Sequence, residues 1–200
     1  MNQAKIVVTG VAAFAAVVAI GACSNPATKE AAPSTPATAQ SSSSAPAGAH
    51  NQSDMMFAHM MIPHHQQAVE MSDTIMRKPG IDPRVVDLAK QIKAAQGPEI
   101  DTMQGWLNQW GMTGMPGMGD MSGMDGMMSP ADMQALKEAQ GVEASKLFLN
   151  QMIKHHQGAI TMAQNEIKNG QFADAVALAK SIATSQQKEI DTMNQILSSL

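Results

Sequence analysis

Apolar residues recur every three or four positions in four long stretches of the chain. The first stretch, residues 54–76, carries one apolar stripe from Phe57 to Ile75, as expected of a helix that buries one face. Three similar stripes occupy residues 83–110, 142–168 and 172–197. A shorter helical segment follows Ser129, and we see no alternating strand pattern. The pattern predicts an all-α protein, a four-helix bundle with one short extra helix.

Polar residues mark the expected helix ends. Ser53 is predicted to cap a first helix that starts at Asp54, because a serine side chain can accept hydrogen bonds from free backbone N–H groups. Asp82-Pro83 is typical of the start of a second helix. Asn169-Gly170 is predicted to end the fourth of the five helices.

The two halves of the pattern are copies of each other. The segment MIPHHQQAVEM, residues 61–71, returns as MIKHHQGAITM, residues 152–162, and residues 88–103 return as residues 178–193. Each copy has only about 50 residues and is too small to bury its own apolar face, so the copies should pack on each other. The predicted folded domain, residues 53–200, comprises repeat one (53–110), a Met-rich loop (111–128) and repeat two (129–200).

The first 52 residues differ from the rest. An apolar run too short to span a membrane follows Lys5, so residues 1–22 are predicted to be a signal peptide. Ile20-Gly21-Ala22-Cys23 resembles the lipobox of bacterial lipoproteins, which implies lipidation of Cys23 and anchoring on the extracytoplasmic face of the cell membrane. The alternatives are an ordinary signal peptide or an uncleaved anchor. Residues 23–52, rich in Ser, Ala and Pro, are predicted to be a disordered linker.

Composition then narrows the function. A net charge of -4, with 13 Lys and Arg residues that form no basic run, argues against a nucleic-acid partner. Cys23 is the only cysteine, so the mature domain has no thiolate and no internal disulfide. The chain has 19 Met residues but only 4 Phe, 2 Trp and no Tyr, and this excess of thioethers requires an explanation.

Each repeat carries two adjacent histidines. A methionine lies three residues before the first histidine and four residues before the second. Neighbouring helical residues point about 100° apart, so the two histidines do not easily hold one ion together. Imidazole suits copper and zinc, and thioether selects soft ions such as Cu(I), so the combination favours copper. The alternative is a set of hydrogen-bonded core histidines. The predicted ligands are Met61, His64, His65 and Met71 in repeat one, and Met152, His155, His156 and Met162 in repeat two.

Two glutamates interrupt the apolar stripes of the second helix in each repeat. Glu99 precedes Met103 by four residues, and Glu189 precedes Met193 by four. Burying a carboxylate is costly unless it is paired or binds a cation. We therefore expect Glu99 and Glu189 to be metal ligands, or acceptors that orient imidazole N–H groups. The alternative is a position at the edge of the stripe, in contact with water or lysine. Met103 and Met193 are predicted as further ligands.

The Met-rich loop places a methionine at every third position among Gly, Pro, Asp, Ser and Thr. A core helix would not be half glycine and polar, so these side chains are not expected to pack in the core. Soft neutral ligands of this kind suit reversible capture of Cu(I) or Ag(I). The alternatives are a low-complexity loop or a patch that binds another protein. The predicted ligands are Met112, Met115, Met118, Met121, Met124 and Met127.

The motifs FxxxMIxHHQ and LFLNQMIKHHQGAITMA resemble the family known as domain of unknown function 305. The resemblance covers residues 55–197 and implies a ferritin-like four-helix bundle, export from the cytoplasm and, in some relatives, copper binding and copper tolerance. The residues of this chain that match the family's motif positions, and to which copper binding would be carried over, are Met61, His64, His65, Met152, His155 and His156. The Glu-x-x-His signature of di-iron ferritins is missing from this chain, which argues against iron oxidation.

Together these features predict an extracytoplasmic, membrane-anchored protein that sequesters or transfers Cu(I) or Cu(II) for metal tolerance or homeostasis. Other soft or borderline metal ions would also suit the ligands, and a copper-handling protein is an expected partner. No nucleophile beside a base and no phosphate-binding loop is present, so we do not expect an enzyme. The alternatives are a metal-dependent oxidoreductase of ferritin-like type and a metal-free interaction module of the cell envelope.

Overall fold

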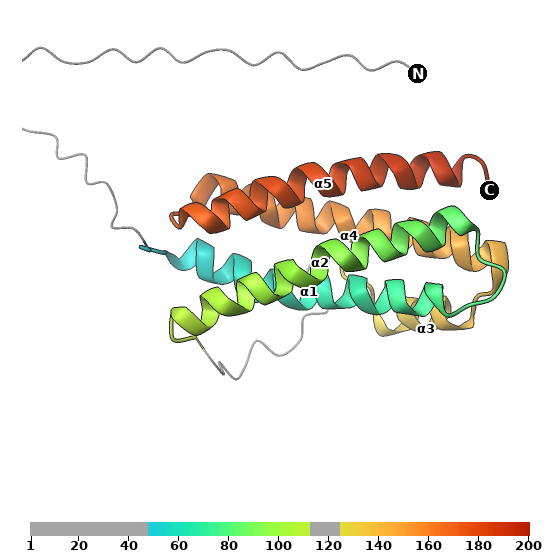
Figure 1. The fold of residues 1–200 in the computed structure, drawn as a ribbon, viewed down its shortest axis with the longest axis horizontal. Helices are drawn as coiled ribbons and strands as arrows, with labels where there is room; N and C mark the ends of the chain where they lie inside the picture. Colours follow the sequence, from blue (N-terminus) through green and yellow to red (C-terminus); the bar gives the residue numbers. More distant parts are fainter. Residues whose placement is uncertain (1–47, 113–124) are drawn as a thin grey trace, which may run out of the picture. The chain divides into compact units, whose positions relative to one another are not determined.

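The computed structural model describes residues 48–112 and 125–200. Its described part is all-helical, and the long helices lie side by side with the short one toward one end of them (Figure 1). The helices are α1 (Gln52–Met76), α2 (Pro83–Gln109), α3 (Pro130–Glu138), α4 (Gly141–Asn169) and α5 (Ala173–Leu197). The predicted all-α four-helix bundle with an extra helix is therefore confirmed. No helix in the described ranges is long and apolar enough to cross a membrane.

Several predictions concern residues outside the described ranges. They are the signal peptide, Cys23 with most of the linker, and the loop residues Met115, Met118, Met121 and Met124.

The predicted N-terminal start of the first helix was wrong. The N-cap is Asn51, not Ser53, and α1 starts at Gln52. The Asn51 side-chain oxygen accepts hydrogen bonds from the backbone N–H groups of Ser53 and Asp54, and the Asp54 carboxylate accepts one from the Asn51 N–H at 2.6 Å. This reciprocal capping box satisfies more free donors than a serine cap alone. The predicted stop at Asn169-Gly170 is confirmed.

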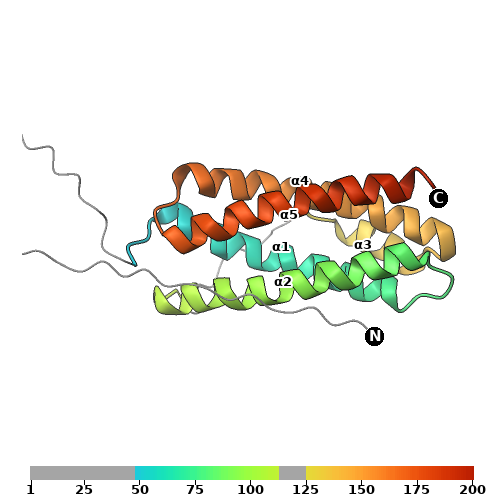
Figure 2. The same ribbon diagram turned by 45° about the horizontal axis from the view of Figure 1, so that its top comes forward.

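The two repeats form two helical hairpins that pack through their first helices. The α1 helix packs against α2, and α4 packs against α5, while the main contact between the hairpins joins α1 to α4. Figures 1 and 2 show this arrangement from two sides. The helices that carry the histidine pairs therefore face each other at the centre of the bundle.

The core is divided into two apolar clusters separated by polar residues. One cluster gathers the C-terminal half of α1 and the N-terminal half of α4, and the other gathers their opposite halves. Between them along each helix lies a set of polar residues, which we call the polar layer. Its buried members are His64, His65, Gln96, His155, His156 and Gln186, with Glu99 and Glu189 partly exposed beside them.

Two carboxyl groups meet at the end of the bundle where α1 begins. Asp54 is fully buried and accepts hydrogen bonds from the backbone N–H groups of Gln171 and Phe172, which fastens the connection between α4 and α5. Glu166 accepts a hydrogen bond from the Ser53 hydroxyl at 2.9 Å. Burial, and a hydrogen bond with Asp54, raise the pKa of Glu166 to about 7. At Asp54, burial acts to raise the pKa, but hydrogen bonds from Glu166 and from the backbone outweigh it, so the pKa is lowered.

Replacing Glu166 with glutamine should stabilise the protein at high pH only. The folded protein raises the pKa of Glu166 from 4.5 to about 7, so wild-type stability is lost as the pH rises through this window. Glutamine can donate to Asp54 without ionising. We expect equal stabilities at pH 5 and a gain of about 1–3 kcal/mol for the variant at pH 8, measured by urea unfolding. Glu143→Gln, at an exposed position, is the control, and a gain independent of pH would contradict this assignment.

Candidate metal centre

His64 and His155 form the inner pair of the polar layer. His64 comes from α1 and His155 from α4, both are fully buried, and their ring centroids lie 3.7 Å apart at an interplanar angle of 37°. Among the described residues, none of their four ring nitrogens makes a hydrogen bond of good geometry, although the Asp125 backbone lies near the His64 ring and the His64 backbone near the His155 ring. Burying a polar group without a hydrogen-bond partner is unfavourable, so the inner pair lowers the free energy of unfolding of the metal-free protein.

The surroundings of the inner pair keep both rings uncharged. Burial, with a smaller effect from His65 and His156, lowers the pKa of His64 to about 3, and the nearby Asp125 backbone opposes this change only in part. Burial and the neighbouring histidines likewise lower the pKa of His155 well below its usual value. A neutral imidazole keeps a lone pair on one ring nitrogen and can use it to bind a metal ion. The inner pair therefore presents nitrogen donors at neutral pH.

His65 and His156 form the outer pair, and each contacts one of the glutamates. His65 Nε2 lies 2.7 Å from the Glu99 carboxylate, and His156 Nε2 lies 2.6 Å from that of Glu189. A carboxylate can only accept, so each ring donates from Nε2 and, when neutral, carries its lone pair on Nδ1. Both Nδ1 atoms are buried and unpartnered. Of the arrangements considered from sequence, the structure shows the glutamates orienting imidazole N–H groups, without a lysine partner.

The buried thioethers lie on both sides of the polar layer. Met61 belongs to one apolar cluster and Met152 to the other, each one helical turn before an inner histidine. Met103 shares the cluster of Met61, and Met193 that of Met152. Met71 is also buried, two turns along α1 from His64, in the cluster that contains Met152.

Other predicted ligands lie elsewhere in the described structure. Met162 is partly buried and lines a groove at the end of the bundle. Met112 and Met127 are partly buried, and Met112 packs against an apolar cluster. The expectation that loop methionines do not pack was wrong for Met112 and for Met128, which is 5% exposed. Both lie at the described ends of the loop, where the neighbouring helices offer apolar contacts.

The donor set of the polar layer suits a soft ion. Within residues 48–112 and 125–200, no three His, Cys, Asp or Glu side chains converge as a ready-made metal-binding group. The inner pair instead offers neutral imidazole nitrogens, with Met61 and Met152 on the adjacent helical turns. Hard ions such as Mg²⁺ and Ca²⁺ prefer oxygen ligands, whereas nitrogen and thioether ligands suit copper.

The end of the Met-rich loop is fastened directly over the two histidine helices. Gly126, with φ +84°, and Gly158 on α4 allow backbones to touch, because a Cβ on Gly158 would lie 2.0 Å from the Asp125 carbonyl oxygen. On α1, the Gln67 amide donates to the Met128 carbonyl at 2.9 Å and accepts from its N–H at 2.7 Å. The loop therefore returns to the bundle beside His155.

Sequence reasoning missed these anchoring residues, although a signal was present. Gln67 and Gly158 occupy the same position in the two repeats, directly after the shared His-His-Gln. The repeats differ there because one copy holds the loop with an amide side chain and the other makes room for its backbone.

Comparisons with known proteins match most of the described domain. Residues 54–197 match the family model described as domain of unknown function (DUF305). A DUF305 protein from Streptomyces coelicolor, described as secreted, is 34% identical, with a TM-score of 0.67 over 74% of this chain and 91% of that one. A DUF305 fragment from Deinococcus radiodurans is 29% identical, with a TM-score of 0.68 over 75% and 98%.

A protein named CopM in its Cu(I)-bound form is 32% identical, with a TM-score of 0.64 over 74% of this chain and 98% of that one. Structures of CopM with Cu(II) and with Ag also match. No curated protein sequence matches the chain.

Proposed function

The chain belongs to the DUF305 family, and from that premise we propose that it binds copper as cargo and sequesters or transfers it outside the cytoplasm. The polar layer, with His64 and His155 at its centre, is the proposed binding site. The Met-rich loop collects ions, and lipidated Cys23 holds the protein at the membrane. In this proposal the protein releases the ion unchanged and catalyses no reaction.

The observation that carries the proposal is the inner pair of histidines. Two neutral imidazoles lie in contact at the centre of the bundle, and their four ring nitrogens have no hydrogen-bond partner among the described residues. A purely structural histidine in a core normally donates and accepts hydrogen bonds. A bound ion would use lone pairs that the protein otherwise leaves without a partner.

The outer pair supports the same site. Glu99 and Glu189 each receive an imidazole N–H and so direct the opposite ring nitrogen into the layer. Such carboxylate contacts fix the orientation of metal-binding histidines in proteins. Met61 and Met152, one turn from the inner pair, would favour Cu(I) over Zn²⁺.

The relatives support copper as the cargo and a position outside the cytoplasm. CopM has been crystallised with Cu(I), Cu(II) and Ag, and the Streptomyces coelicolor protein is described as secreted. A soft ion in more than one oxidation state agrees with the mixed nitrogen and sulfur donors of this chain. A copper-handling protein that delivers or accepts the ion is the expected partner.

Titration of the metal-stripped protein with Cu(I), Ag(I) or Cu(II) tests the proposal. An ion that binds the folded state should raise the free energy of unfolding, by about 2.7 kcal/mol when its free concentration is one hundred times Kd. The part of this gain that comes from the polar layer should be lost when His64, His65, His155 and His156 are all changed to Ala, so the gain of this variant should be clearly smaller than that of wild type. Changing Met115, Met118, Met121 and Met124 to Ser should instead lower the number of ions bound and keep the gain. Equal gains in wild type and the four-histidine variant would contradict the proposed site.

A further inference from the structure

The repeat creates two equivalent grooves, and α3 covers one of them. This covered groove lies between the end of α1 and the start of α4, and Met133 and Leu136 of α3 are buried against its cluster. Gln151 donates a hydrogen bond to the Asp132 carbonyl at 3.0 Å, and Lys78 donates to carbonyls at the C-terminal end of α3. The α3 helix therefore completes the core on this side (Figure 1).

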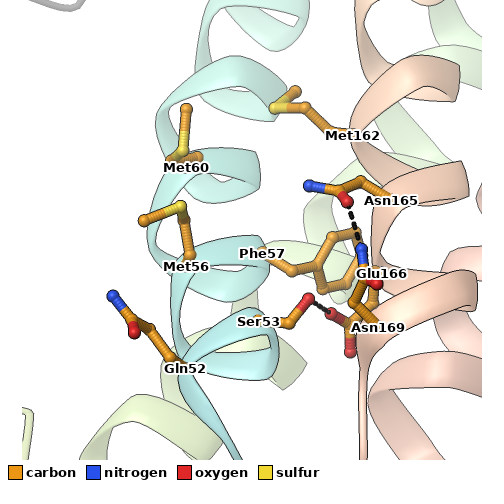
Figure 3. A pocket seen from close by; sticks show the side chains of 9 residues that line it. All are labelled: Gln52, Ser53, Met56, Phe57, Met60, Met162, Asn165, Glu166 and Asn169. Atoms are coloured by element: carbon orange, nitrogen blue, oxygen red, sulfur yellow. Dashed lines mark hydrogen bonds between the residues drawn. The ribbon is translucent and has the colours of Figure 1, made fainter.

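The equivalent groove lies between the start of α1 and the end of α4, and no described helix covers it. Its cavity has a volume of about 470 Å³. The apolar part of its lining is Met56, Phe57, Met60 and Met162, and the polar part is Gln52, Ser53, Asn165, Glu166 and Asn169. We call this groove the open groove. Figure 3 shows Met56 and Met60 one above the other on α1, and Met162 reaching toward them from α4. Met56 is 41% exposed, and within residues 48–112 and 125–200 Val142 is the other exposed large apolar residue.

The repeats differ at the residues that line the two grooves. With an offset of ninety-one residues, the equivalents of Met56, Met60 and Met162 in the covered groove are Leu147, Gln151 and Met71. The open groove thus has three sulfur atoms where the covered groove has one. Core packing does not require this sulfur, because Leu147 packs against the apolar cluster in the equivalent place.

Oxygen atoms also lie beside the open groove, and some of them are already hydrogen-bonded. The Asn165 side-chain oxygen accepts a hydrogen bond from the Asn169 amide at 2.5 Å, and Glu166 Oε2 accepts one from the Ser53 hydroxyl, whereas Glu166 Oε1 is buried and has no hydrogen-bond partner among the described residues. The preference for a soft ion therefore comes from the three sulfur atoms. Thioethers are neutral, polarizable ligands that select soft ions.

We propose that Met56, Met60 and Met162 form a second site, at the open groove, for a soft monovalent cation of the Cu(I) or Ag(I) class. The spacing of four residues places Met56 and Met60 on one face of α1, and Met162 supplies the third sulfur from α4. This site is separate from the polar layer. It rests on the proposed function only for the identity of the ion in the cell.

The test follows the methionine ε-methyl signals of the full chain by NMR while Ag(I) is added. Ag(I) is diamagnetic and binds the same soft ligands as Cu(I). We expect the ¹³C signals of Met56, Met60 and Met162 to shift together at one midpoint. The triple variant M56L/M60L/M162L, which keeps the side chains apolar, should bind one Ag(I) fewer. The control variant M55L/M76L/M133L changes three methionines outside the groove and should bind as many ions as wild type.

The outcomes separate this site from the polar layer. Groove signals that stay unchanged while other methionines respond, or an unchanged number of ions in the triple variant, would overturn the second site. Groove signals that respond to protein concentration in place of Ag(I) would also overturn it, because the groove would then bind a second copy of the chain. The variant without the four polar-layer histidines should keep the groove shifts, so failure of either site can be recognised by itself.

Discussion

Gly158→Ala is expected to destabilise the protein by about 3 kcal/mol, at the upper end of the usual cost of overpacking. The new Cβ would lie 2.0 Å from the Asp125 carbonyl oxygen and 2.8 Å from the Gly126 Cα. Both neighbours are backbone atoms, so no side chain can rotate away to relieve the contact. Either α4 or the returning loop must move, and the loop is also held to α1 through Gln67 and Met128. Urea unfolding of the metal-free protein measures the change.

The bundle provides a matched control for this substitution. Gly105 lies within α2, and a Cβ at this position would meet no atom within 4 Å apart from its chain neighbours and the backbone of its own helix. Because alanine loses less conformational freedom than glycine in a helix, Gly105→Ala should stabilise the protein by about 0.5–1 kcal/mol. If Gly158→Ala behaved like Gly105→Ala, the close approach of residues 125–126 to α4 would be refuted.

The fold could be predicted from the sequence because two independent patterns agree. The apolar stripes give the helices, and the duplication requires two incomplete hairpins to pack on each other. The inward direction of His64 and His155 follows from the same stripes. Each lies three residues after an apolar stripe residue, Met61 or Met152, and so shares its face of the helix. These features depend on helix geometry alone, which a single sequence records well.

The burial of His65 and His156 could not be predicted in this way. Each lies about 100° around the helix from its inner neighbour, which a single-stripe argument places at the edge of the core. In the bundle, α1 packs against both α2 and α4, so its buried arc is wider than one stripe. Glu99 and Glu189 then reach the outer rings from the flanking helices. Such contacts depend on which helices become neighbours.

The inner and outer histidines should therefore respond in opposite ways to removal. The inner rings lack hydrogen-bond partners among the described residues, whereas each outer ring satisfies a carboxylate. Loss of an unpartnered group removes a cost, and loss of one member of a pair leaves the other without its partner. Stability alone can thus separate the two kinds of histidine before any metal is added.

Replacing both inner histidines with leucine, in the variant H64L/H155L, should stabilise the metal-free protein and remove the polar layer's share of its stabilisation by copper. Leucine has a similar volume and no polar atom, so the variant should gain about 2 kcal/mol in metal-free unfolding free energy. Addition of Cu(I) should then stabilise the variant less than it stabilises wild type. The control H65L/H156L leaves Glu99 and Glu189 without their imidazole partners and should lose about 1–2 kcal/mol. If a site is retained for its ligand, removing the ligating groups should stabilise the metal-free protein. Equal destabilisation of both variants in urea would therefore contradict the proposed site and show that the inner pair serves packing.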